Sequence, residues 1–316
     1  MTTTDTKSTS KATGGNQPEA VDVASAVPRR RPLQWVFTAV VLVLAAQMVW
    51  FLVGNERFQW DVVREWFAVG SVMRGLGMTL ALTAVAMAVG VLLGTVAAVM
   101  RLSDNPVARG VGFTYVWVFR SVPPLVQLIL WYNLAYLVPA ISLGIPFGPT
   151  FVTWDTNGLI TPFTAAVLGL GLNEGAYMAE IVRAGLLSVD PGQQEAAKSL
   201  GLKPSHAFFR VVLPQAMRVI IPPTGSQVIT LLKGTSLVSV IAMSDLLFSV
   251  QTIYNRTFEI IPMLLVASLW YLIIVSVLSV AQSRLEKRFA RGATRGGSTP
   301  ARRRSFARPI RQERPV

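Results

Sequence analysis

The chain has 316 residues, of which 52% are hydrophobic and only 14% are charged. A soluble domain normally carries about 25% charged residues, and several apolar runs here are long enough to cross a bilayer, so composition excludes a soluble globular protein. The net charge of +13 does not indicate nucleic-acid binding, because the arginines gather in the two tails and a few loops instead of one folded face. With no cysteine and a single histidine, disulfides, thiolate metal sites and histidine clusters are excluded as well.

The two ends of the chain have the composition of disordered tails. Residues 1–33 are rich in Thr, Ser, Gly and Ala, and residues 285–316 are basic and rich in Gly, Pro and Ser. Between these tails the sequence predicts six membrane-spanning helices and therefore an all-α, polytopic helical membrane protein. The expected spans are 34–53, 71–100, 111–138, 163–186, 219–248 and 262–283.

The distribution of Lys and Arg predicts the orientation. If the N-terminus is inside, the four cytoplasmic segments carry five, two, four and eleven Lys and Arg residues in chain order, 22 in all. The outer segments carry four in total. Loops rich in Lys and Arg remain in the cytoplasm, so both termini are expected there. The paired glycines Gly90/Gly94 and Gly171/Gly175 have the spacing that lets two helix backbones approach closely in lipid. Pro222-Pro223 predicts a kink in the fifth span.

Residues 187–218 form a polar cytoplasmic loop between the fourth and fifth spans, and its first half predicts a short helix. Asp190 can cap that helix, Pro191 fits its first position, and Gln193 completes a capping box. Gly201 suits the left-handed conformation that ends a helix.

The second half of this loop predicts another short helix, which Pro204 begins and Pro214 ends. Such a hairpin either lies on the membrane surface without a partner or docks in a groove of another protein. The small apolar face available for docking consists of Ala196, Ala197 and Leu200.

One motif extends across both helices: a Glu-Ala-Ala triplet, a glycine after three residues and, nine residues later, Val-x-Leu-Pro. Its residues are Glu195, Ala196, Ala197, Gly201, Val211, Leu213 and Pro214. The motif resembles the cytoplasmic signature of ATP-binding-cassette (ABC) importer permeases, which usually have isoleucine where this chain has valine. The resemblance implies a coupling helix that inserts into a cleft on a separate ATPase subunit, with Glu195, Ala196, Ala197, Gly201, Leu213 and Pro214 forming the contact.

Three further motifs resemble the polar amino-acid permeases, the histidine, glutamine, glutamate and arginine group. They are Phe-Arg-Ser-Val-Pro-Pro-Leu-Val-Gln at 119–127, Ala-Tyr-Met-Ala-Glu-Ile-Val-Arg-Ala-Gly at 176–185 and Lys-Gly-Thr-Ser-Leu-Val-Ser-Val-Ile at 233–241. The first departs from the family pattern at three positions and the third has Gly234 in place of Asp. The resemblance implies a type I ABC importer transmembrane domain of five core spans over residues 70–284, to which span 34–53 is added.

This resemblance also implies partners and a mechanism. The expected partners are an ABC ATPase dimer, an extracytoplasmic amino-acid-binding protein, a second permease (the same or a related chain) and membrane lipid, with no nucleic acid. The chain would lie in the bacterial cytoplasmic membrane and translocate a polar amino acid by alternating access. It would bind no cofactor itself, because ATP and Mg would be bound by the partner ATPase. It also lacks the Gly-x-x-x-x-Gly-Lys-Ser/Thr loop that holds phosphates.

Ionisable residues inside the spans are candidates for the substrate pathway, because a charge in the bilayer usually faces a cavity or a partner. An amino-acid zwitterion needs an acceptor for its ammonium group and donors for its carboxylate. The substrate-pathway candidates are Asn173, Glu174, Lys233, Thr235 and Ser236. The alternatives are a structural ion pair between Glu174 and Lys233, and a structural pair between Glu180 and Arg183, one helical turn apart.

Two alternatives to this function remain at the level of sequence. An ion-coupled secondary amino-acid transporter would explain the buried charges but not the Glu-Ala-Ala…Gly…Leu-Pro loop. An ABC permease for a different small polar solute would explain both. An enzyme is not expected, because the chain lacks cysteine, has one histidine in a cytoplasmic loop, and so offers no nucleophile–base or metal constellation.

Overall fold

The computed structural model describes residues 32–145 and 148–290 and divides the chain after Glu56 into two units, which we describe separately. The first contains α1 (Pro32–Gly54), an apolar helix of 23 residues. At 1.5 Å per residue this helix is about 35 Å long, enough to cross a bilayer, as predicted for span 34–53. Most of the expected tail 1–33 and residues 291–316 of the other tail lie outside the described residues. Residues 285–290 were predicted to be disordered but belong to the last helix.

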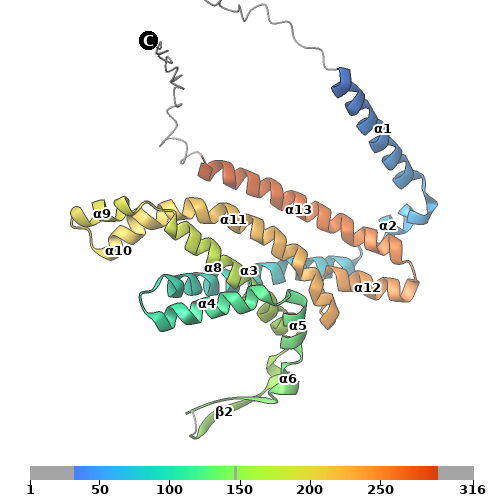
Figure 1. Cartoon of the computed structure of the whole chain (residues 1–316). Helices are drawn as coiled ribbons and strands as arrows, with labels where there is room; N and C mark the ends of the chain where they lie inside the picture. Colours follow the sequence, from blue (N-terminus) through green and yellow to red (C-terminus); the bar gives the residue numbers. More distant parts are fainter. Residues whose placement is uncertain (1–31, 146–147, 291–316) are drawn as a thin grey trace, which may run out of the picture. The chain divides into compact units, whose positions relative to one another are not determined.

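The second unit is a helical bundle with one two-stranded sheet (Figure 1). In chain order its elements, which follow η2 (Glu56–Phe58), are α2 (Trp60–Trp66), α3 (Gly70–Leu102), α4 (Pro106–Ser121), α5 (Pro124–Tyr132), α6 (Leu134–Leu137), β1 (Ala140–Gly144), β2 (Thr150–Asp155), α7 (Thr156–Leu159), α8 (Pro162–Leu187), α9 (Pro191–Ser199), α10 (Pro204–Ala207), η3 (Phe208–Val212), α11 (Leu213–Gly234), η4 (Thr235–Ile241), α12 (Leu246–Thr257) and α13 (Ile260–Ala290).

Helix α8 is the central helix of this unit and packs against α3, α4, α5 and α11. Its pairing with α3 depends on small residues, as the sequence predicted. A Cβ atom added at Gly90 would lie 2.9 Å from the Glu174 side chain, and one added at Gly94 would lie 2.7 Å from the carbonyl oxygen of Gly175. Close backbone approach gives van der Waals contact where lipid supplies no hydrophobic force between helices.

The predicted span 111–138 is wrong as a single helix, because the chain bends by 101° between α4 and α5. The bend falls at Pro123 and Pro124, which have no N–H to offer the preceding turn. The side-chain amide of Gln127 donates instead to the carbonyl oxygens of Phe119, at 2.9 Å, and Val122, at 2.7 Å. This internal donor makes a sharp bend tolerable inside a membrane protein.

The predicted span 219–248 is also interrupted. Helix α11 continues through Pro222 and Pro223 and gives way to the 3-10 turn η4. Ala242 then adopts the left-handed conformation at φ 56°, and α12 follows at an angle of 45° to the preceding helical stretch.

Among the described residues, three helices are long and apolar enough to cross a membrane: α1, α3 and α13. Two bent pairs qualify when each is taken as one span, α4 with α5, and Pro204–Ile241 with α12. Helix α8 is long enough but carries Glu174, Glu180 and Arg183. Because neighbouring helices cover 13 of its 26 residues, α8 faces protein over much of its surface and does not need the apolar composition of a lipid-facing span.

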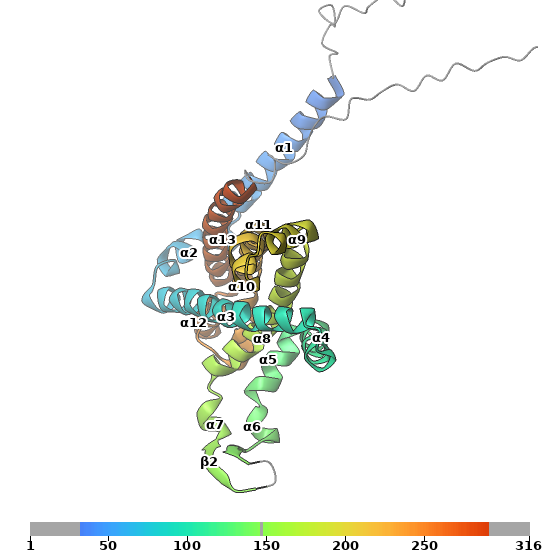
Figure 2. The ribbon, with the colours of Figure 1, turned by 90° about the vertical axis from the view of Figure 1, so that its left-hand side faces the viewer.

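The antiparallel pair β1–β2 was not predicted from the sequence. Its register places Ile141 opposite Trp154 and Leu143 opposite Val152, so these apolar residues share one face. On the other face the hydroxyl oxygens of Ser142 and Thr153 lie 3.1 Å apart. The hairpin extends away from the helices in both views (Figures 1 and 2).

Candidate coupling segment and intramembrane charged site

The loop with the Glu-Ala-Ala motif folds into α9 and α10 at one end of the second unit, opposite the connection between α12 and α13 (Figure 1). Asp190 caps α9, as predicted, with its carboxylate accepting a hydrogen bond from the backbone N–H of Gly192 at 2.7 Å. The predicted capping box is not formed, because the N–H of Gln193 donates to the backbone oxygen of Asp190 instead.

The end of α9 has the expected left-handed glycine, with Gly201 at φ 72°. The N–H of Gly201 donates to the oxygen of Lys198 at 2.9 Å, and the N–H of Leu202 donates to the oxygen of Ala197 at 3.1 Å. This pair of bonds is the Schellman motif, which satisfies the last carbonyl groups of a helix. The shape of α9 is therefore determined by its own sequence.

Pro214 does not end the second helix, contrary to prediction. Helix α10 continues through the π turn η3 directly into α11, with Leu213 and Pro214 in the first turn of α11. The change of hydrogen-bonding register in a π turn accommodates a residue that has no N–H. Leu213 and Pro214 thus lie where the segment that contains α9 and α10 continues into the long helix α11.

The exposed surface of α9 also differs from the predicted apolar face. Glu195 and Ala196 are exposed and 81% of Leu200 is accessible, but Ala197 is only 3% accessible because its side chain packs inside the segment. Phe209 in η3 adds a large exposed apolar side chain, 64% accessible. A charged residue beside exposed apolar ones is the surface that a docking segment needs.

Between α3, α4 and α8, a cluster of partly exposed charged side chains surrounds Glu180. The Oε1 atom of Glu180 lies 2.5 Å from Nη1 of Arg101 and 3.5 Å from Nη1 of Arg120, and its Oε2 atom lies 3.0 Å from Nη2 of Arg183. The predicted pair Glu180–Arg183 is confirmed, but it belongs to a larger cluster that connects α3, α4 and α8. Sequence reasoning missed Arg101, which it counted as a loop residue, and Arg120, which it read only as part of the motif at 119–127.

The substrate-pathway candidates are not brought together as one site. Glu174 is 5% accessible, and its Oε1 atom has no hydrogen-bond partner among the described residues. Lys233 is exposed, and no ion pair between it and Glu174 is present in the described part of the chain. The hydroxyl of Thr235 donates to the oxygen of Leu232, at 2.7 Å, and that of Ser236 to the oxygen of Lys233, at 2.8 Å.

Asn173 has a role that the sequence did not reveal. Its side-chain amide donates to the carbonyl oxygen of Phe119 at 2.6 Å. This is one of the two carbonyl groups at the bend between α4 and α5 that Gln127 also satisfies. Asn173 therefore connects α8 to the broken helix.

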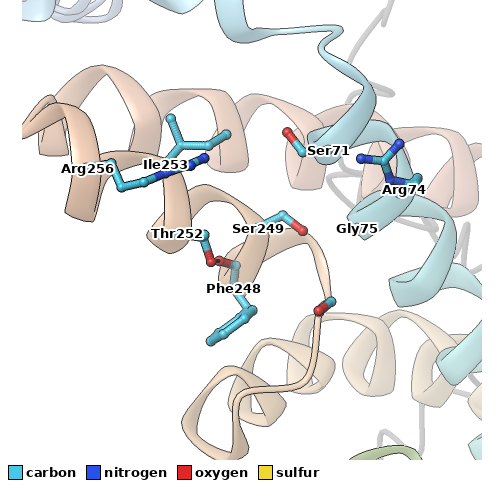
Figure 3. Close-up of a pocket in the computed structure, with 9 residues that line it drawn as sticks. Ser71, Arg74, Gly75, Phe248, Ser249, Thr252, Ile253 and Arg256 are labelled. Atoms are coloured by element: carbon cyan, nitrogen blue, oxygen red, sulfur yellow. Dashed lines mark hydrogen bonds between the residues drawn. The ribbon is translucent and has the colours of Figure 1, made fainter.

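A charged hollow lies between the start of α3 and α12, at the end of the unit away from α9 (Figure 3). It encloses about 280 Å³, with Arg74 and Arg256 in its lining. Asp245 caps α12 beside this hollow by accepting a hydrogen bond from the N–H of Phe248 at 2.8 Å.

A bundle of long apolar helices, with an exposed, self-capped segment at one end and a charged cluster between three helices, has the features of a membrane transport permease. The chain belongs to the family of binding-protein-dependent transport system inner membrane components, whose model matches residues 90–291. It is a multi-pass inner-membrane protein with the fold of an ABC importer transmembrane domain.

Several characterised relatives are similar over most of the chain. The arginine transport system permease protein ArgU of Corynebacterium glutamicum is 45% identical, over 88% of this chain and 86% of its own length. The L-cystine transport system permease protein TcyB of Bacillus subtilis is 37% identical, over 73% of this chain and 92% of its own. A solved structure described as an amino acid ABC transporter with histidines has 36% identity and a TM-score of 0.58, and covers 69% of this chain and 94% of that one.

Proposed function

We propose that this chain is the permease subunit of an ABC importer that carries a polar amino acid across the cytoplasmic membrane. A separate ATPase dimer drives transport, an extracytoplasmic binding protein delivers the substrate, and a second permease completes the pathway. The observation that carries the proposal is α9, a helix closed at both ends by its own hydrogen bonds and exposed at one end of the bundle. Such a segment is suited to fit a preformed cleft on a partner protein.

We propose an orientation in which α9 and α10 face the cytosol and the connection between α12 and α13, at the opposite end of the second unit, lies outside. Both termini would then be cytoplasmic, an arrangement that the Lys and Arg distribution supports. In this arrangement residues 34–53 form an additional span and residues 70–284 form the permease domain.

The coupling residues are tested with Glu195→Lys. Because Glu195 is exposed and makes no ion pair among the described residues, its replacement leaves the fold intact but reverses the charge of the docking surface. We expect the variant to insert normally, to lose copurification with the ATPase subunit and to lose uptake. Glu286→Lys, in the last turns of α13, is the control and should copurify as wild type does. Normal ATPase binding by Glu195→Lys would contradict the coupling role.

The same segment contributes the other residues of the proposed contact, Ala196, Ala197, Gly201, Leu213 and Pro214. Ala196 is exposed and touches the ATPase directly in this proposal. Ala197 and Gly201 act by shaping α9, and Leu213 and Pro214 by connecting it to α11.

The names of the relatives indicate the class of substrate. The relatives are named as permeases for arginine, L-cystine and, at 34% identity, glutamine in Escherichia coli. We infer a polar amino acid for this chain from these names. Ligand binding by the cognate extracytoplasmic protein identifies the amino acid; a binding protein that takes only sugars or peptides would contradict the inference.

Glu174 remains a proposed pathway residue, and so do Asn173 on the same helix, Lys233 on α11, and Thr235 and Ser236 in η4, although the structure does not gather them into one site. The buried Oε1 atom of Glu174 has no hydrogen-bond partner among the described residues, which is costly in a membrane protein unless it serves a ligand or a second chain. We expect Glu174→Gln, a change of similar shape, to alter the KM for uptake or the range of amino acids transported. Unchanged uptake kinetics would leave Glu174 with a structural role only.

A further inference from the structure

The charged cluster around Glu180 borders a hollow between α3, α4 and α8. The hollow encloses about 320 Å³, within the size range of small-molecule sites. Its charged lining residues are Arg101, Arg120 and Glu180, and the aromatic rings of Trp117 and Tyr177 lie beside them.

Positive charge exceeds negative charge in this cluster. Three guanidinium groups share the single carboxylate of Glu180, so the four side chains together carry a net charge of two. Arg101 and Arg183 make the short contacts, at 2.5 and 3.0 Å. Arg120 lies at 3.5 Å, longer than the usual 2.7–3.2 Å of such a hydrogen bond.

Of the three arginines, Arg120 therefore has the weakest hydrogen bonding to the rest of the protein. A guanidinium has five N–H donors, and Arg120 makes no hydrogen bond of the usual length to any described residue. Its guanidinium carbon lies 5.2 Å from the centre of the Tyr177 ring, which holds the group beside the hollow. The side chain of Arg120 is 43% accessible, compared with 15% for Arg101.

The excess positive charge also indicates what the open side of the hollow faces. A cluster with excess positive charge is costly against hydrocarbon, and intramembrane ionisable residues face a water-filled cavity or another protein surface. The open side of the hollow therefore faces the aqueous pathway or the second permease. In either case the free donors of Arg120 are available to an anionic group.

We propose that this hollow binds the α-carboxylate of the transported amino acid, and that Arg120 is the residue that contacts it. The planar fork of an arginine matches a carboxylate with two parallel hydrogen bonds. The ring of Trp117, which also lines the hollow, offers its π face to the ammonium group of the same molecule. The proposal rests on the amino-acid import function and locates the carboxylate away from Glu174 and Lys233.

The test uses the permease–ATPase complex purified without its binding protein. Uptake by the complete system first identifies the transported amino acid among L-arginine, L-histidine, L-glutamine, L-glutamate and L-cystine. Equilibrium binding of that amino acid, in tritiated form, is then measured with displacement by the amino acid itself or by its α-carboxamide. We expect the carboxamide to bind at least about tenfold more weakly, because it lacks the charge for a charge-assisted hydrogen bond to Arg120.

The variants separate contact with the ligand from structural ion pairing. Arg120→Gln should bind the amino acid at least about tenfold more weakly and should not distinguish it from the carboxamide, whereas Arg120→Lys should lose less. Arg183→Gln is the matched control. It removes an equal charge from the same carboxylate but does not line the hollow, so its binding should remain within about threefold of wild type.

Three results would overturn the proposal: wild-type affinity in Arg120→Gln, equal displacement of the bound amino acid by its carboxamide, or no binding to a wild-type complex that transports. If Arg120→Gln does not assemble, the carboxamide comparison on wild type and Arg120→Lys decides the question. Absence of amino-acid uptake by the complete system would instead contradict the proposed function, so the two failures are distinguishable.

Discussion

The coupling segment and the Glu180 cluster are stabilised in opposite ways. Helix α9 is capped by Asp190 and ended by Gly201 through bonds between residues at most five positions apart. The Glu180 cluster depends on Arg101, which is 79 positions away in the sequence, and on Arg120 from a third helix. The hydrogen bonds that close the ends of α9 are local in the sequence, whereas the Glu180 cluster exists only when three helices are assembled.

This difference has a consequence for transport. In the proposed coupling, α9 receives a push from the ATPase, and the continuity of α10 and η3 with α11 would carry that push into the bundle. A cluster made of contacts between helices changes whenever those helices move, so it can respond to the same push. Four substitutions test the two regions and the helix packing on which the Glu180 cluster depends, beginning with the largest expected effect.

Gly94→Leu should abolish assembly of the bundle. A side chain at this position would overlap Met178 and the backbone of Gly175 and Ala179 on α8. We expect little correctly folded protein after detergent extraction, measured by size-exclusion chromatography and thermal unfolding. Gly77→Leu, on the same helix but with nothing within 4 Å of the added Cβ, is the control and should fold normally.

Gly201→Val should abolish uptake while leaving the amount of inserted protein unchanged. Gly201 has φ 72°, and the left-handed conformation costs other residues roughly 1–2 kcal/mol, with β-branched residues the least tolerant. Gly201→Asn, which adopts this conformation more readily, should retain much of the uptake. Equal transport by both variants would show that the shape of α9 does not matter for coupling.

Glu180→Gln should destabilise the bundle by about 1–3 kcal/mol, because it leaves three arginines without their shared carboxylate. Since Glu180 is 27% accessible, water screens part of that repulsion and the protein should still insert. Thermal unfolding of the purified complex measures the loss. A melting temperature equal to that of wild type would show that the cluster contributes nothing to helix assembly.

Asp190→Ala should have the smallest effect. Removing an N-cap carboxylate costs about 0.5–2 kcal/mol locally, and the Schellman bonds at the other end of α9 remain. We expect reduced but measurable uptake and unchanged thermal unfolding of the bundle. Asp190→Asn, which keeps the acceptor oxygen, should transport as wild type does. Uptake by Asp190→Ala equal to that of wild type would show that the cap is dispensable.

Features with local causes were predictable from the sequence. The cap at Asp190, the stop at Gly201 and the close approach at Gly90 and Gly94 each follow from a residue type at one position or a short spacing, and the structure confirms them. The prediction that Pro214 ends the second short helix was wrong, because a proline can also follow a π turn within a continuing helix.

Features that depend on the relative rotation of helices were not predictable. Glu174 and Lys233 were placed at similar depth by counting residues, but depth does not say which way a side chain points, and the two do not pair in the described chain. Asn173 and Gln127 were not recognised as partners of a helix break, because their acceptor, the oxygen of Phe119, becomes free only when the chain bends.

The central claim, that a partner ATPase drives this permease through α9, is tested most directly by reconstitution into liposomes. Uptake of the labelled amino acid is measured with the ATPase subunits inside and the loaded binding protein outside, with ATP or with a proton or sodium gradient as the energy source. We predict uptake that requires enclosed ATP and is lost in Glu195→Lys. Full uptake driven by an ion gradient in liposomes that contain this chain without the ATPase would contradict it.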